Sequence, residues 1–133
     1  MVTSLELSKK LWEKGLRFKS EKYHCQSPDG EWIVLPIPDL PNAGNYWENV
    51  SAISAYSTDE LLTVMPYMIY EDSDNFNLLI RKSPKDYVIR YDSKYRAINR
   101  DNKILVEGLG ELCLWLLDNG YKFDTAKKMI VKP

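Results

Sequence analysis

The sequence has few of the residues that carry local catalytic and metal-binding motifs. Its 133 residues include one histidine and two cysteines. Two widely separated cysteines and one histidine cannot form a typical four-ligand zinc site, and they do not make a disulfide framework. We therefore expect Cys25 and Cys113 to be free thiols in a reducing compartment. The sequence predicts neither a metal site nor a cofactor.

Long apolar runs and phosphate-binding motifs are also missing from the sequence. No window approaches the roughly 18 consecutive apolar residues that span a membrane, and the early charges Glu6, Lys9 and Lys10 are not typical of a secretory signal. No glycine-rich phosphate loop precedes an expected helix. We expect a cytoplasmic protein with no membrane partner, folded as a single domain over residues 1–133.

Three segments have helical patterns. Residues 4–14 place Leu5, Leu11 and Trp12 on one face, after a possible N-cap at Thr3 or Ser4. Residues 57–60 read Ser-Thr-Asp-Glu, a capping box that predicts a helix over 58–65, ended by Pro66. Residues 105–119 carry a leucine stripe closed by Gly120. Gly108 and Gly110 weaken this helix, so we expect one or both to allow close approach to a sheet.

Strand patterns complete the predicted fold. Residues 21–35 read as a hairpin around a Ser-Pro-Asp-Gly turn, and residues 67–70, 76–82 and 86–92 read as an antiparallel meander. Residues 36–45 are predicted to be a long proline-rich loop, and a flexible C-terminal tail is predicted from about residue 122. The fold class is α+β: an antiparallel sheet of four or five strands with two or three helices mainly on one face.

Candidate protein-binding residues are apolar groups in unexpected places. Leu114 lies on the acidic side of the last helix, and Tyr46 and Trp47 follow the proline-rich loop. Trp32 lies in the return strand of the first hairpin. Tryptophan and tyrosine dominate binding hot spots. Packing of these rings into the core is the alternative, and a second copy of the chain is an alternative partner.

The segment 81–103 suggests nucleic-acid binding as another function. It has eight basic residues against three aspartates, interleaved with Tyr87, Tyr91 and Tyr95. Cations pair with phosphates and aromatic rings stack on bases, although the near-neutral net charge of −1 argues against this function. The residues of this alternative are Arg81, Lys82, Arg90, Lys94, Arg96 and Arg100.

Enzyme function has little support in the sequence. His24 and Cys25 are adjacent, but neighbouring side chains of a strand point to opposite faces and cannot form a dyad. We therefore expect a non-enzymatic protein. An enzyme or small-ligand binder whose site is assembled by the fold stays open as a second alternative.

Several segments together resemble a group of small α+β proteins common in bacteriophage and prophage genomes. The resemblance covers roughly 100 residues and is carried by residues 5–11, 58–62, 79–82, 87–91 and 111–120. These motifs are structural, so the resemblance implies no catalytic residue. It implies an accessory protein in the cytoplasm of a bacterial host. By analogy with other such proteins, the resemblance further implies a role in host interaction or anti-defence. The loop at 36–45 departs from the group's pattern.

Overall fold

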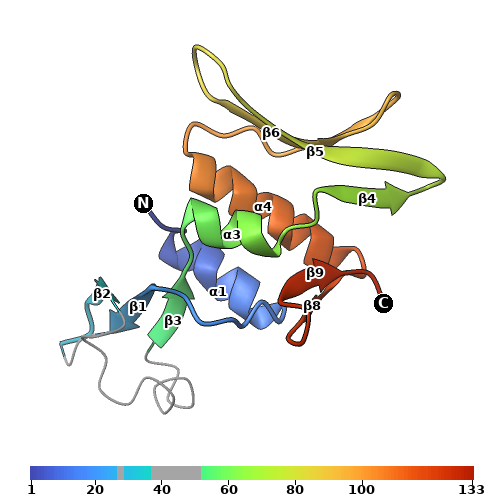
Figure 1. The fold of residues 1–133 in the computed structure, drawn as a ribbon. Helices are drawn as coiled ribbons and strands as arrows, with labels where there is room; N and C mark the ends of the chain where they lie inside the picture. The colour runs from blue at the N-terminus through green and yellow to red at the C-terminus, as the bar shows by residue number, and fades with distance from the viewer. Residues whose placement is uncertain (27–28, 37–51) are drawn as a thin grey trace.

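The computed structural model describes residues 1–26, 29–36 and 52–133 and confirms the α+β class. Within these residues the chain forms three helices and three antiparallel sheets (Figure 1). The predicted sheet of four or five strands is thus divided into separate sheets. The helices are α1 (Leu5–Glu13), α3 (Thr58–Val64) and α4 (Leu105–Asp118). The strands are β1 (Lys22–Gln26), β2 (Trp32–Pro36), β3 (Ala52–Ala55), β4 (Met68–Glu71), β5 (Asp74–Lys82), β6 (Tyr87–Asp92), β7 (Ala97–Asn99), β8 (Lys122–Asp124) and β9 (Met129–Val131).

The starts of α1 and α3 follow the capping residues in the sequence. The Ser4 hydroxyl accepts a hydrogen bond from the Leu7 N–H at the start of α1. At α3 the Ser57 hydroxyl accepts from the Glu60 N–H, and the Glu60 carboxylate accepts from the Ser57 N–H. The predicted capping box is therefore confirmed.

The predicted meander forms the larger sheet, in the order β4-β5-β6-β7. Its last strand, β7, lies in a polar stretch whose structure the sequence did not define. On the inner face Ile80 pairs with Ile89 and Leu78 with Tyr91, and Ile89 and Tyr91 are fully buried. The Tyr91 hydroxyl donates to the Pro66 carbonyl, 2.6 Å away, which ties β6 to the end of α3. Figure 1 shows all three helices on one side of this sheet.

The smaller three-stranded sheet has the order β2-β1-β3. The predicted hairpin supplies β1 and β2, while β3 was not foreseen. Pro36 was assigned to the loop 36–45, but it is the last residue of β2 and pairs with Lys22. A proline is accepted there because β2 is an edge strand with one side unpaired. The remainder of that loop lies outside the described residues.

Thr3 joins α1 to this smaller sheet. Its N–H donates to the Tyr56 carbonyl, and its hydroxyl accepts from the Tyr56 N–H. The same hydroxyl shares a 2.7 Å hydrogen bond with Ser8, and the Thr3 carbonyl lies 2.7 Å from His24 Nε2. Thr3 and Ser8 are fully buried, so this network satisfies polar groups that would otherwise be costly to bury.

Helix α4 is the central element of the core, and it contacts α1, α3, β6 and β8. Its two glycines are used differently. A Cβ at Gly108 would overlap the Ile89 side chain and lie 2.7 Å from the Arg100 carbonyl oxygen, so Gly108 allows the predicted close approach to the sheet. A Cβ at Gly110 would meet Leu7 and Thr3, so Gly110 allows close approach to α1 and its preceding segment.

The flexible tail predicted from about residue 122 is instead a β8–β9 hairpin. Ile130 is fully buried and Tyr121 nearly so, because the hairpin closes one end of the core. Tyr121 donates its hydroxyl hydrogen to the Glu71 carboxylate at 2.7 Å, and the Lys132 ammonium lies 2.8 Å from the same oxygen. These hydrogen bonds hold the pKa of Glu71 below its usual value. They join the hairpin to β4.

The packing at Gly108 predicts a destabilising Gly108→Ala substitution. Alanine favours helix by about 1 kcal/mol, but its methyl group would collide with backbone as well as with Ile89. We expect a net loss of about 1–3 kcal/mol in the free energy of unfolding, measured by urea denaturation. Gly110→Ala is the control, and it should cost less because only side-chain atoms obstruct it. A Gly108→Ala variant as stable as the parent would contradict the close approach.

Candidate functional site

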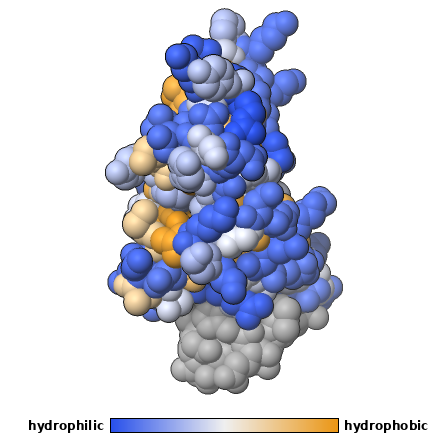
Figure 2. Space-filling view, turned by 90° about the vertical axis from the view of Figure 1, so that its right-hand side faces the viewer, coloured by the Kyte–Doolittle hydropathy of each residue, from blue (hydrophilic) through white to orange (hydrophobic). Residues whose placement is uncertain are grey.

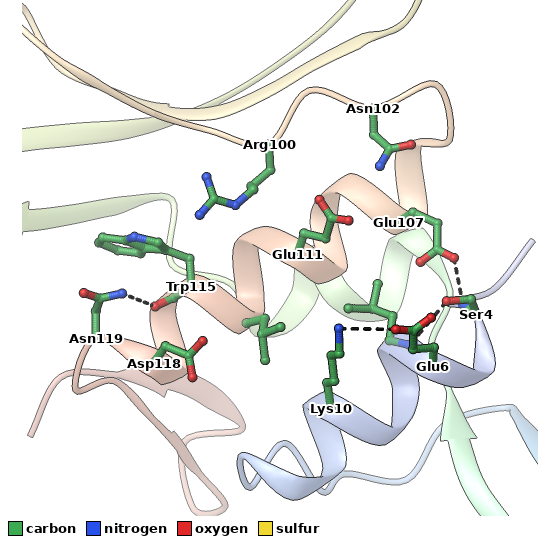
Figure 3. Close-up of a pocket in the computed structure, with 12 residues that line it drawn as sticks. Ser4, Glu6, Lys10, Arg100, Asn102, Glu107, Glu111, Trp115, Asp118 and Asn119 are labelled. Carbon is green, nitrogen blue, oxygen red and sulfur yellow. Dashed lines mark hydrogen bonds and ion pairs between the residues drawn. The ribbon is translucent and has the colours of Figure 1, made fainter.

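A hollow of the described surface lies between α1 and α4, and we call it the α1–α4 groove. It has a volume of about 560 Å³. Leu7 and Lys10 of α1 form one side, and Arg100 and Asn102 come from the segment that joins β7 to α4. Figure 3 shows that α4 runs along the groove, with Arg100 directed toward it from the opposite wall. Three segments distant in sequence therefore meet at this site.

Besides Glu107, helix α4 contributes a row of four side chains, which we call the α4 stripe: Glu111, Leu114, Trp115 and Asp118. Their spacing of three and four residues puts them on one side of the helix. The fully buried Leu109, Leu112 and Leu116 form the other side. Leu114 and Trp115 are half-buried, so the stripe offers apolar surface between two carboxylates.

The groove carries more negative than positive charge. Its lining includes four carboxylates and two basic side chains. Three of the carboxylates have partners. Glu6 lies 3.5 Å from Lys10, Asp118 lies 2.9 Å from Lys14, and Glu107 accepts the Ser4 N–H.

Glu111 and Trp115 differ from these paired groups. Among the described residues, neither the Glu111 carboxylate nor the Trp115 indole N–H has a hydrogen-bond or ion-pair partner, and Glu111 is exposed. They are four residues apart on one helix face. A carboxylate beside an aromatic ring is a suitable pair for a cationic side chain, through ion pairing and cation–π attraction.

Of the four predicted protein-binding residues, the structure places only Leu114 in the groove. Trp32 lies on β2, half-buried, with the Lys9 ammonium 4.9 Å from its ring centroid. Tyr46 and Trp47 lie outside the described residues. Trp115 was missed in the sequence, although its four-residue spacing from Glu111 and its position next to Leu114 were a usable signal.

The basic segment 81–103 is divided by the sheet rather than gathered on one surface. Arg81 and Arg90 lie on the face away from α4, since Arg81 pairs with Val88 and Arg90 with Leu79. Lys82 pairs with Tyr87 and so lies on the face toward α4, while Arg100 lines the groove. Lys94 is exposed in the turn before β7.

Two arginines of this segment form ion pairs with aspartates of the same chain. Arg90 lies 3.1 Å from Asp101, and Arg96 lies 3.2 Å from Asp72 and 3.7 Å from Asp74. Of the three interleaved tyrosines, Tyr91 is fully buried and Tyr87 is half-buried, while Tyr95 is 77% exposed. One exposed ring does not make a row of stacking platforms for successive bases.

The sole histidine and the two thiols occupy the interior. His24 Nε2 contacts the Thr3 carbonyl, and β1 is a strand, so Cys25 points to the other face. Burial raises the pKa of both cysteine thiols. The structure therefore does not bring His24 and Cys25 together as a nucleophile and base. Among the described residues, no three His, Cys, Asp or Glu side chains are gathered so that they could hold a metal ion.

No protein-family model matches the chain, and the searches of curated proteins and of solved structures found no match. No described helix has the length and apolar character needed to cross a membrane.

Burial of His24 predicts a stability change near neutral pH. Desolvation lowers its pKa below the ordinary 6.5 and outweighs the opposing contact with the Thr3 carbonyl. The unfolded chain then binds the proton more readily, so the stabilising effect is complete above pH 6.5 and is lost as the pH falls below it. We expect the free energy of unfolding to fall on acidification from about pH 7.5 to about pH 5.5.

The matched variant is His24→Gln, whose side-chain N–H can still reach the Thr3 carbonyl but does not titrate. Urea denaturation across the same pH range should show a flatter slope for this variant. Equal slopes in the two proteins would show that His24 does not cause the change. At lower pH both proteins should lose free energy of unfolding equally, because the carboxyl pKa values of Glu71 and Asp101 are lowered in the folded state.

Proposed function

We propose that this chain is a non-enzymatic accessory protein that binds another protein through the α1–α4 groove. The observation that carries the proposal is the α4 stripe, where an unpaired carboxylate and a half-buried tryptophan lie beside Leu114. Hot spots of protein interfaces combine such apolar anchors with a polar surround. The face of the molecule shown in Figure 2 is mostly hydrophilic, with hydrophobic residues in small separate patches.

Charge complementarity defines the partner segment. The excess of carboxylates in the groove favours a segment with lysine or arginine, and Leu114 and Leu7 favour an aliphatic residue next to it. A partner cation would lie against the Trp115 ring and pair with Glu111. Arg100 opposes this cation, although its guanidinium already donates to the Asn99 carbonyl at 2.6 Å. The proposed occupant is therefore a basic, partly aliphatic segment of a protein.

The state of the reactive side chains supports a non-enzymatic role. His24 is 7% exposed and held against a backbone carbonyl, and the Cys113 thiol is fully buried with a raised pKa. A nucleophile needs access and an adjacent base. These side chains have neither.

The cellular setting of the proposal comes from the resemblance to small phage and prophage proteins. That resemblance suggests a bacterial cytoplasm and a target among host or defence proteins. It rests on the structural segments, not on a residue of the groove, so the groove can be tested without it.

The test uses a fluorescently labelled peptide of alternating leucine and arginine pairs, and its counterpart with glutamate in place of arginine. The basic peptide should bind saturably, shift the Trp115 indole N–H signal in NMR spectra and weaken with added salt. Glu111→Lys should reduce its affinity by about tenfold, because the pair changes from attraction to repulsion. Arg100→Gln should increase the affinity.

Glu13→Lys is the matched control, since Glu13 is an exposed residue of α1 outside the groove lining and the net charge changes equally. It should change the affinity far less than Glu111→Lys. Equal effects of the two variants, or equal binding of the acidic peptide, would contradict the proposal. Binding of single-stranded DNA that is lost in Arg100→Gln would favour the nucleic-acid alternative instead.

A further inference from the structure

A second hollow of the described surface shares no lining residue with the α1–α4 groove, and we call it the Phe18 hollow. It lies between the segment after α1, helix α3 and the β8–β9 hairpin, and its volume is about 410 Å³. This is within the range of roughly 300–1,000 Å³ found for small-molecule sites. Nothing in the proposed function uses it.

The floor of the hollow is aromatic. Phe18 and Phe123 are half-buried, and their ring centroids lie 5.4 Å apart in a tilted arrangement. Phe18 also stacks on the buried Tyr56, with 4.6 Å between centroids. Val64 of α3 completes the apolar lining. A flat or aliphatic body would be desolvated against this surface.

The backbone below the floor is held by buried hydrogen bonds. The Tyr56 hydroxyl donates to the Leu16 carbonyl at 2.6 Å, and the Ser54 hydroxyl donates to the Phe18 carbonyl at 3.1 Å. Tyr56 and Ser54 are both fully buried. The hollow is therefore preformed, which lowers the ordering cost of binding a ligand.

The rim of the hollow is cationic. Arg17, Lys19 and Lys128 line it, against one carboxylate, Glu60. Both Glu60 oxygens already accept backbone N–H groups, from Ser57 and Glu21. Arg17 stacks on Trp12 and donates to its carbonyl. Lys19 and Lys128 have no ion-pair or hydrogen-bond partner among the described residues.

We infer that the Phe18 hollow binds a small amphiphilic carboxylate. Its apolar body lies on Phe18 and Phe123, and its carboxylate pairs with Lys19 and Lys128. The charge of the rim selects an anion over a cation of the same shape, and the apolar floor selects against small inorganic anions.

The test is an NMR titration of the whole chain with 4-phenylbutyrate, followed at the ring signals of Phe18 and Phe123. Octanoate tests whether an aliphatic body binds as well as an aromatic one. The control 4-phenylbutylamine has the same body with the opposite charge, and the control acetate has the carboxylate without the body. Phenylbutyrate or octanoate should bind saturably and shift these signals. The amine and acetate should bind at least about tenfold more weakly.

The variant Lys19→Glu/Lys128→Glu should lose about tenfold in affinity for the carboxylate. Lys122→Glu/Lys127→Glu is the control, because these exposed lysines on or near the same hairpin do not line the hollow and the net charge changes equally. Equal losses in the two variants, binding of the amine as tight as that of the carboxylate, or no shift of the ring signals would overturn the inference. The Lys19→Glu/Lys128→Glu variant should still bind the basic leucine–arginine peptide in the α1–α4 groove as the parent does, which would show that the two sites are separate.

Discussion

Burial of α4 is the constraint on which the rest of the structure depends. The helix contacts the larger sheet, helices α1 and α3 and the C-terminal hairpin, and its leucines at 109, 112 and 116 are fully buried. Gly108 brings its backbone against Ile89 and the Arg100 carbonyl, and Gly110 brings it against Leu7. With so much of its surface covered, α4 keeps Glu111, Leu114, Trp115 and Asp118 as a row of at least partly exposed side chains along the groove with α1. That row is the α4 stripe, so the proposed binding site is a direct result of how the core is packed.

Buried polar groups are satisfied by a small set of hydrogen bonds that join distant segments. Thr3 connects α1, β1 and the segment before α3, while Glu71 connects β4 to the last hairpin. Each connection gives a polar group a hydrogen-bond partner at a position where leaving it unpaired would be costly. The connection through Thr3 also places His24, considered as a possible base in the sequence, in a structural contact instead. The charged groups of the two proposed sites, Glu111 in the groove and Lys19 and Lys128 around the hollow, have no such partner among the described residues and are exposed at the surface.

The two surface sites have opposite electrostatic character, and each arises from contributions that lie far apart in the chain. The α1–α4 groove joins residues from the first helix, the last helix and the segment after β7, and carboxylates predominate in it. The Phe18 hollow joins residues near positions 18, 63 and 125, and cations surround an aromatic floor. One nearly neutral chain, with a net charge of −1, thus carries both a carboxylate-rich groove and a hollow lined by cations. Net charge alone therefore says little about its partners.

The sequence by itself determined the elements whose signals are local. The capping box at Ser57, the leucine stripe of α4 and the alternation in β6 each depend on neighbours within a few residues, and each was predicted. Leu114 was also noticed, because its helix face is visible in the spacing. Strands β3, β7, β8 and β9 are short, and partners elsewhere in the fold stabilise them, so their own sequences carried a weak signal. Tertiary structure alone decided that Trp115 joins Leu114 in a groove with α1, and that the basic residues of 81–103 are split between faces. Those outcomes depend on contacts between residues far apart in the chain, which no local pattern encodes.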